Sequence, residues 1–168
     1  MEGAQSPLSR DELNDLMDYG NERMNSSACS LDPFRREVRV SALTDEKVLL
    51  MTSCEAGAYN TIWLAWLVSR QRPYIAHPVR LTLPFQPPGD APRDVELVNA
   101  SYDDRHQELV TLDKGRAPGD CGIQTRWRYD GQRFSLVRYA QQPQCDNWQG
   151  PDAWPTLWVT RSVAHPLR

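Results

Sequence analysis

Apolar and polar residues alternate most clearly between Ile123 and Tyr129, where every second residue is apolar or threonine and the others are glutamine or arginine. Because successive side chains of a strand point to opposite faces, this pattern predicts a strand with one buried face and one charged, solvated face. Asp130-Gly131 is a typical two-residue hairpin turn, since such turns need positive φ angles, and a return strand is expected over 134–139. We expect Trp127, which lies on the apolar face, to be a core residue.

A helix is predicted near the N-terminus, from about Arg10 to Met24. The preceding Ser9 and the following Glu12 form a capping box, in which each side chain caps a backbone N–H group of the other residue. Leucine and methionine residues then recur at helical spacing. We expect the helix to cover one face of a sheet, although a helix that binds a partner is the alternative.

Further short apolar or alternating runs predict additional strands, which lie at 36–43, 48–53, 61–69, 74–83, 95–101, 108–112 and 156–162. The run 61–69 is nearly all apolar, which favours a central strand buried on both faces, although periodicity alone also permits a short helix. The segment 84–93 contains four prolines and is expected to be an exposed loop.

These elements predict an α+β fold in which β-structure dominates. We expect an N-terminal helix packed on about eight short antiparallel strands, arranged as a twisted sheet, a sandwich or a partly closed barrel. A single domain is expected over residues 1–168, with residues 1–8 outside its ordered part.

The four cysteines are expected to form disulfides, because an even number in a turn-rich chain is typical of an oxidising compartment. Four buried free thiols are the alternative. No Cys-x-x-Cys pair and no histidine at ligand spacing is present, so no metal site is expected. Of the alternative pairings, we predict Cys29–Cys54, which would join the end of the helix to a strand, and Cys121–Cys145, which would flank the hairpin.

Charge and hydropathy exclude two classes of function. The formal net charge is −3 and the sequence pI about 5.6, which argues against general nucleic-acid binding. No apolar run is long enough to span a membrane. The first ten residues lack the apolar core of a signal peptide, so residues 1–10 are not expected to direct export.

The loop Lys114–Gly122, with the sequence K-G-R-A-P-G-D-C-G, is the most distinctive segment. Its glycines allow backbone N–H groups to converge on an anion, and Lys114 and Arg116 would add positive charge. The alternative is a turn that needs unusual φ angles and carries solvated charges. The spacing of a phosphate-binding P-loop is absent.

This loop, the following R-W-R-Y-D-G-Q-R-F-S-L at 126–136, C-E-A-G-A-Y-N at 54–60 and W-P-T-L-W at 154–158 carry a family resemblance. From about Cys29 to Trp158, the chain resembles domain of unknown function 1176, a family of uncharacterised bacterial envelope proteins. Members of that family are usually longer and carry further cysteines, so the chain resembles their C-terminal portion. The resemblance implies a periplasmic or secreted location and brings no catalytic assignment.

Catalytic chemistry is sparse in the sequence. None of the three histidines, His77, His106 and His165, accompanies a recognisable nucleophile motif. The adjacent acids Asp103 and Asp104 are typical of an exposed turn. We therefore expect a non-enzymatic binding or interaction domain without a cofactor. The alternatives are an inhibitor or immunity protein that blocks a secreted or envelope enzyme, and a small hydrolase.

The expected binding surface is the loop Lys114–Gly122. Lys114 and Arg116 would contact an acidic group of an envelope protein or another anionic envelope component, and Asp120 would brace the loop through backbone amides. Tyr59 and Asn60 are expected nearby because their segment shares the same family resemblance. Trp148 and Trp154 are further candidates for exposed aromatic contacts, with buried loop anchors as the alternative.

Overall fold

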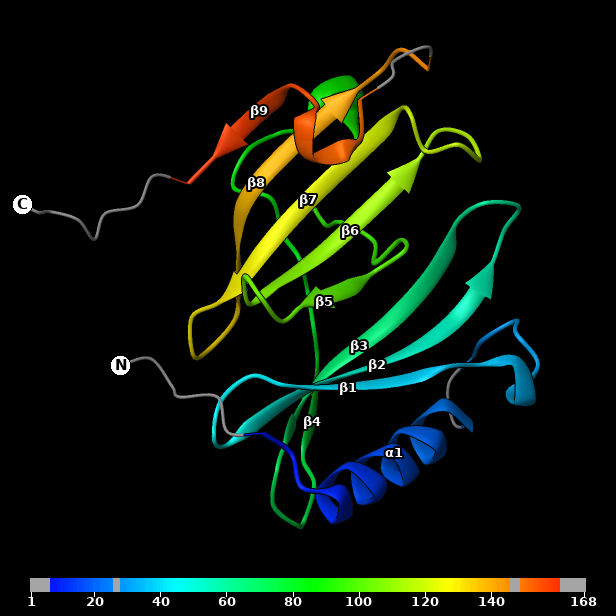
Figure 1. Cartoon of the computed structure of the whole chain (residues 1–168), viewed down its shortest axis with the longest axis vertical. Helices are drawn as coiled ribbons and strands as arrows, with labels where there is room; N and C mark the ends of the chain where they lie inside the picture. Colours follow the sequence, from blue (N-terminus) through cyan, green and yellow to red (C-terminus); the bar gives the residue numbers. More distant parts are fainter. Residues whose placement is uncertain (1–6, 26–27, 146–148, 161–168) are drawn as a thin grey trace, which may run out of the picture.

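The computed structural model describes residues 7–25, 28–145 and 149–160, and these contain one α-helix, three short 3-10 helices and nine strands (Figure 1). The helices are α1 (Arg10–Asn25), η1 (Pro33–Arg35), η2 (Pro88–Asp90) and η3 (Pro151–Ala153). The strands are β1 (Val38–Ala42), β2 (Lys47–Ala56), β3 (Thr61–Ser69), β4 (Ala76–Pro78), β5 (Ser101–Asp103), β6 (Glu108–Lys114), β7 (Gly122–Tyr129), β8 (Phe134–Gln142) and β9 (Thr156–Val159).

The strands form two antiparallel sheets, and within each sheet every strand pairs with its neighbour in the sequence. The first sheet has the order β1-β2-β3-β4 and the second has the order β5-β6-β7-β8-β9. The α+β, β-dominant prediction is therefore confirmed, and the sheets face each other as a sandwich (Figure 1).

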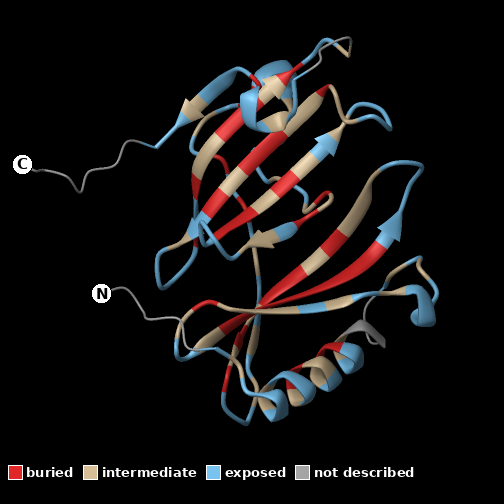
Figure 2. Cartoon of the chain, viewed as in Figure 1, coloured by how far each residue is buried: buried red, intermediate tan, exposed pale blue. Residues whose placement is uncertain are grey.

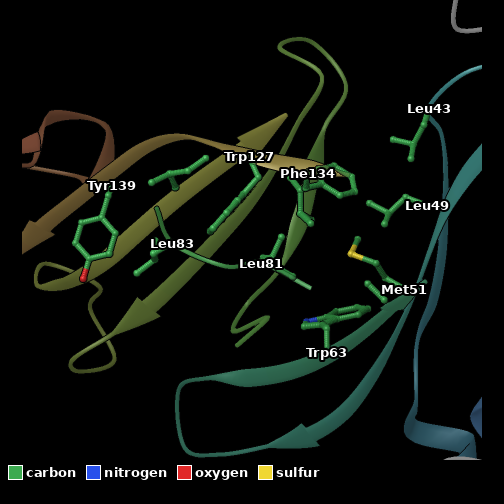
Figure 3. Close-up of a cluster of buried hydrophobic side chains, with 13 residues drawn as sticks. Leu43, Leu49, Met51, Trp63, Leu81, Leu83, Trp127, Phe134 and Tyr139 are labelled. Atoms are coloured by element: carbon green, nitrogen blue, oxygen red, sulfur yellow. The ribbon is translucent and has the colours of Figure 1, made fainter. Parts of the chain in front are cut away.

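The main core lies between the two sheets, as Figure 3 shows. Trp127 is fully buried there, which confirms the predicted faces of β7. Its indole N–H donates to the Thr125 hydroxyl at 2.7 Å, so the polar atom of this large side chain is satisfied inside the core. The other large buried side chains of this cluster are Leu43, Leu49, Met51, Trp63, Leu81, Leu83, Leu109, Phe134, Leu136 and Tyr139.

Helix α1 covers the outer face of the first sheet. Its Leu16 is fully buried against a second apolar cluster that includes Leu50 and Trp66. Gly20 permits the close approach, because a Cβ atom at that position would lie 2.7 Å from the Val38 Cγ1 atom of β1. The helix is therefore the third layer of the molecule, as the sequence predicted.

The predicted capping box is present at the start of α1. The Ser9 N–H donates to Glu12 Oε1 at 3.0 Å, and the Glu12 N–H donates to Ser9 Oγ at 3.1 Å. Glu12 Oε1 also accepts a hydrogen bond at 3.2 Å from Arg70, whose side chain is buried after β3. The cap thus ties the first turn of the helix to the sheet beneath it.

One strand prediction needs correction. The segment 95–101 is not a strand, because Asn99 has a positive φ of 46° and its side chain binds backbone groups of neighbouring strands; β5 begins only at Ser101. The strand β3 is buried on both faces, as predicted: Trp63 and Ala65 lie in the main core, and Trp66 and Val68 lie in the second apolar cluster. Strand β2 is buried even more completely, since residues 48–54 are all buried. The reason is that α1 packs over β1 and β2.

Both predicted disulfides are formed. Cys29–Cys54 joins the segment after α1 to β2, and Cys121–Cys145 joins the start of the β7–β8 hairpin to the chain that leaves it. The described part of the chain has no free cysteine. Each sheet therefore carries one covalent crosslink.

Candidate functional site

The loop Lys114–Gly122 connects β6 to β7 and closes on itself. The Gly115 N–H donates to the Cys121 carbonyl at 3.0 Å, and the Gly119 N–H donates to the Arg116 carbonyl at 3.0 Å. A side chain at Gly115 would collide with the disulfide, since its Cβ atom would lie 2.8 Å from Cys121 Sγ. At least two of the loop's amide donors therefore stabilise the loop itself.

Arg116 and Asp120 form an internal brace of this loop. The Arg116 guanidinium donates to both carboxylate oxygens of Asp120, at 2.8 and 2.5 Å, and also to the Cys145 carbonyl. The hydrogen bond from Arg116 lowers the pKa of Asp120. Asp120 thus braces the loop, but through the arginine instead of the expected backbone amides.

Asn60 lies against the same loop, so the structure brings the two predicted segments together. The Asn60 side-chain N–H donates to the Lys114 carbonyl at 3.0 Å, and its oxygen accepts from the Lys114 N–H at 3.1 Å. Asn99 donates to the same Asn60 oxygen at 2.6 Å. Because Asn60 follows β2 and Lys114 ends β6, this side chain connects the two sheets. Tyr59 beside it is 40% exposed.

The disulfide also bears on the metal prediction. In the described chain, Asp120, Cys121 and Cys145 place potential ligand atoms within 4.8 Å of one another. The two sulfur atoms are bonded to each other, however, and it is the free thiolate that ligates a metal. Neither cysteine of this group can therefore bind a metal as a thiolate.

A groove that the sequence did not reveal opens between the two sheets, and we call it the basic groove. It has a volume of about 710 Å³ and is lined from β3, β4, β8, β9 and the chain between β4 and β5. Its charged or titratable residues are His77, Arg80, Arg93 and Arg133, and no acidic residue is among the described residues that line it. These residues come from three separate segments, at 77–80, 93 and 133, and no local sequence motif joins them.

The wall of the groove holds one guanidinium in place. Arg93 donates from Nε and Nη2 to the Leu83 carbonyl, at 3.1 and 2.9 Å. The Arg80 side chain is 81% exposed, and its closest carboxylate, Asp94, lies 4.0 Å away. Arg133 is exposed in the turn between β7 and β8. Apolar side chains, Phe134 among them, also line the groove.

The outer face of the second sheet carries a different set of charges. Arg126 donates to Glu108 at 3.1 Å and to Asp103 and Asp152 at 3.2 Å, and Arg128 donates to Glu108 at 2.6 Å. The alternating arginines of β7 are thus paired with carboxylates. This arrangement favours a structural role over a receptor for an external anion.

Among the described residues, one histidine forms a pair with a carboxylate. His106 Nδ1 lies 2.8 Å from Asp103 Oδ2, and hydrogen bonds from His106 lower the pKa of Asp103 to about 2. Within the described residues, no serine, threonine or cysteine is hydrogen-bonded to His106. His165 lies outside the described residues.

The aromatic candidates divide in two. Trp154 is only 2% exposed, and its indole N–H donates to the Gln149 carbonyl at 3.1 Å. It is a buried anchor of its loop, which is the alternative that the sequence offered at this position. Trp148 lies outside the described residues.

The fold and these surfaces define a disulfide-bonded, two-sheet α+β protein with a basic groove between its sheets. Over residues 1–161 the chain matches the family described as Protein of unknown function (DUF1176), and it belongs to that family. It is 66% identical over 156 residues to the Uncharacterized protein YpfG of Escherichia coli (strain K12), covering 93% of this chain and 45% of that protein. The chain thus spans less than half the length of this relative.

No solved structure matches the chain. Of the helices that the structure describes, none is both long and apolar enough to cross a membrane.

Proposed function

We propose that this chain is a non-catalytic binding domain of the bacterial cell envelope, and that the basic groove holds an acidic ligand. The observation that carries the proposal is the groove's charge. Its described lining contains His77, Arg80, Arg93 and Arg133 and no acid, although the whole chain has a net charge of −3. The ligand class is a molecule or peptide that bears carboxylate or phosphate groups.

The shape of the groove supports this ligand class. A volume of about 710 Å³ falls in the range of roughly 300–1,000 Å³ that is usual for small-ligand sites. A guanidinium can donate two parallel hydrogen bonds to a carboxylate or phosphate. Apolar side chains such as Leu67 and Leu136 would contact the uncharged part of the ligand. The groove therefore suits a partly apolar anion.

The envelope location rests on the two disulfides. Disulfides form and persist outside the reducing cytosol, so both crosslinks support an oxidising compartment. The periplasm of a bacterium is such a compartment, and the relative named above is bacterial. We propose the periplasm as the place where the chain acts.

The loop Lys114–Gly122 is proposed as a second, protein-binding surface. It extends beyond the strands that it connects (Figure 1), and its disulfide and internal brace would lower the entropy lost on binding. Lys114 has no ion pair among the described residues, and Tyr59 is half-exposed beside it. A rigid projecting loop also favours the second candidate function, an inhibitor or immunity protein that inserts this loop into an envelope enzyme.

The groove is tested with an acidic probe, an acetylated and amidated peptide of alternating glutamate and leucine, followed by fluorescence anisotropy. The variant Arg80→Glu with Arg133→Glu should weaken binding by about tenfold or more, because charge-assisted hydrogen bonds contribute roughly 1.5–3 kcal/mol each. Arg10→Glu with Arg105→Glu is the matched control, since both arginines are exposed, the change in net charge is the same and neither lines the groove. Added salt should weaken the binding of the unmodified protein.

Equal binding by the groove variant and the control would refute the groove as the site. The loop is tested separately by Lys114→Ala. If capture of an envelope protein depends on Lys114 and not on Arg80 and Arg133, the inhibitor function replaces the acidic-ligand function. Turnover of an ester, peptide or glycan by the purified protein would contradict both.

A further inference from the structure

A second, smaller cavity differs in charge from the basic groove, and we call it the acidic pocket. Its volume is about 220 Å³, and it lies between the inner face of β6, β7 and β8 and the segment that runs from Leu83 to Val98. Its interior is formed by buried side chains, while the exposed Pro92, Asp94, Glu96 and Asp113 lie at its opening. The pocket therefore has a mostly buried interior that opens onto a solvent-facing rim.

The interior is mainly apolar but contains one unusual polar group. Tyr139 is 3% exposed, and its ring packs edge-on against Phe85 at a centroid distance of 5.2 Å. Its hydroxyl points away from the apolar side chains of the main core (Figure 3) and has no hydrogen-bond partner among the described residues. The hydroxyl is therefore available for a hydrogen bond with a ligand or with water at the pocket.

The rim is acidic. Asp94, Glu96 and Asp113 line the pocket, and no basic residue is among its described lining residues. Asp94 accepts a hydrogen bond from the Thr82 hydroxyl at 2.7 Å, so part of its hydrogen-bonding capacity is already used within the protein. Although Asp113 lies at the opening, surrounding protein atoms partly desolvate its carboxyl group and raise its pKa. Burial and the charge of Asp113 raise the pKa of Tyr139. A cation beside Asp113 would offset this burial of negative charge.

We propose that the acidic pocket binds a primary ammonium group on an aliphatic chain, with Asp113 as its ion-pair partner and the Tyr139 hydroxyl as a hydrogen-bond acceptor. The apolar walls, which include Val95 and Ile123, suit the methylene groups that precede the ammonium. The pocket is smaller than the roughly 300–1,000 Å³ of drug-sized sites, so it would hold a small amine or one lysine side chain.

The test is a titration with n-butylamine hydrochloride, observed by backbone amide NMR shifts. Saturable shifts of residues around Tyr139 and Asp113 are expected, with n-butanol and butyrate binding at least about tenfold more weakly, as expected when a charged partner is lost. Asp113→Asn should weaken the binding of butylamine by a similar factor. Asp104→Asn is the matched control, because Asp104 is exposed, loses the same charge and does not line the pocket.

Glu96→Gln is a second variant in case Asp113→Asn does not fold, since Glu96 is exposed on the rim; a smaller weakening is expected there. The ammonium could come from a free amine or from a lysine side chain of a protein partner. Nα-acetyl-lysine N-methylamide, whose side-chain ammonium is free, distinguishes the two. Tighter binding of this lysine mimic than of butylamine assigns the pocket to a protein partner, and equal or weaker binding assigns it to a free amine.

No saturable binding of either amine, equal binding of butanol and butylamine, or unchanged affinity in a folded Asp113→Asn variant overturns the proposal. The acidic peptide probe of the basic groove tests other residues. The proposals for the basic groove and for the acidic pocket can therefore be refuted separately.

Discussion

The two sheets share one core, but their outer faces are built differently. The outer face of the first sheet is apolar and is covered by α1 (Figure 2). The outer face of the second sheet carries Arg126, Arg128 and Glu108, and the short η3 contacts its β8. The difference shows which sequence pattern lets a sheet take a helix on its outer face. β2 is apolar on both sides, and β7 alternates, since antiparallel sheets tolerate one solvated face.

The largest effect is expected in the core that the sheets share. Trp127→Ala should lower the free energy of unfolding by about 3–5 kcal/mol, because it removes a fully buried aromatic side chain. Urea unfolding measured by circular dichroism checks this value. Trp127→Phe should have a smaller effect, since it fills most of the cavity. Separate transitions for the two sheets in the alanine variant would show that the core does not join them into one cooperative unit.

The next effect concerns the outer layer of the first sheet. Leu16→Ala removes a fully buried side chain between α1 and the sheet, and it should cost about 2–5 kcal/mol. The cost should be nearly the same at low and high salt, because the lost interaction is apolar. Leu13→Ala is the control on the same helix, since Leu13 is 38% exposed. Equal costs at both positions would mean that α1 does not dock as described.

A smaller, salt-dependent effect is expected on the second sheet. Glu108→Gln weakens the hydrogen bonds from Arg126 and Arg128 to a side chain that is only 7% exposed. The cost should be about 1.5–3 kcal/mol, the value of hydrogen bonds to charged groups. It should fall modestly as salt is added, because Arg128 is half-exposed while the buried Glu108 is screened less. Asp104→Asn in the exposed turn should change stability little. If the cost of Glu108→Gln did not change with salt, the two outer faces would not differ in the kind of interaction that stabilises them.

The smallest effect is a pH dependence of the same outer face. Hydrogen bonds from His106 and Arg126 lower the pKa of Asp103 from an ordinary value of 3.8 to about 2. A lowered pKa in the folded state stabilises the fold above the ordinary value, and this stability is lost as the pH falls from about 4 toward 2.

Asp103→Asn should therefore flatten the fall of the melting temperature in this pH range, and differential scanning calorimetry measures it. Asp104→Asn should leave the curve unchanged. A steeper fall in the Asp103 variant would contradict the assigned direction of the pKa shift.

Local patterns predicted the elements whose causes are local. The capping box at Ser9 and Glu12 marked the start of α1, and Asp130-Gly131 marked the β7–β8 hairpin, because each depends on neighbours in the sequence. Segment 95–101 was wrongly predicted because the left-handed backbone of Asn99 depends on Thr61 and on β6, which no local pattern reveals.

The candidate sites were harder to predict than the elements. The proximity of Asn60 and Lys114 followed only from shared family resemblance, and the structure then showed the hydrogen bonds. The basic groove was missed because His77 and Arg80 lie at β4 whereas Arg133 lies in the β7–β8 turn, and they meet only when the sheets pack. A groove between two sheets depends on that packing, and alternation within one strand does not describe it.

The two disulfides have a consequence for how the chain is oxidised. Each joins a cysteine to the next one along the sequence, at separations of 25 and 24 residues. Suppose that the chain enters an oxidising compartment from its N-terminus. Cys54 then arrives while Cys29 is the one free thiol of these four, and Cys145 arrives while Cys121 is. A catalyst that joins thiols in order of arrival would then give the native pairing directly, with no thiol–disulfide reshuffling through mixed intermediates.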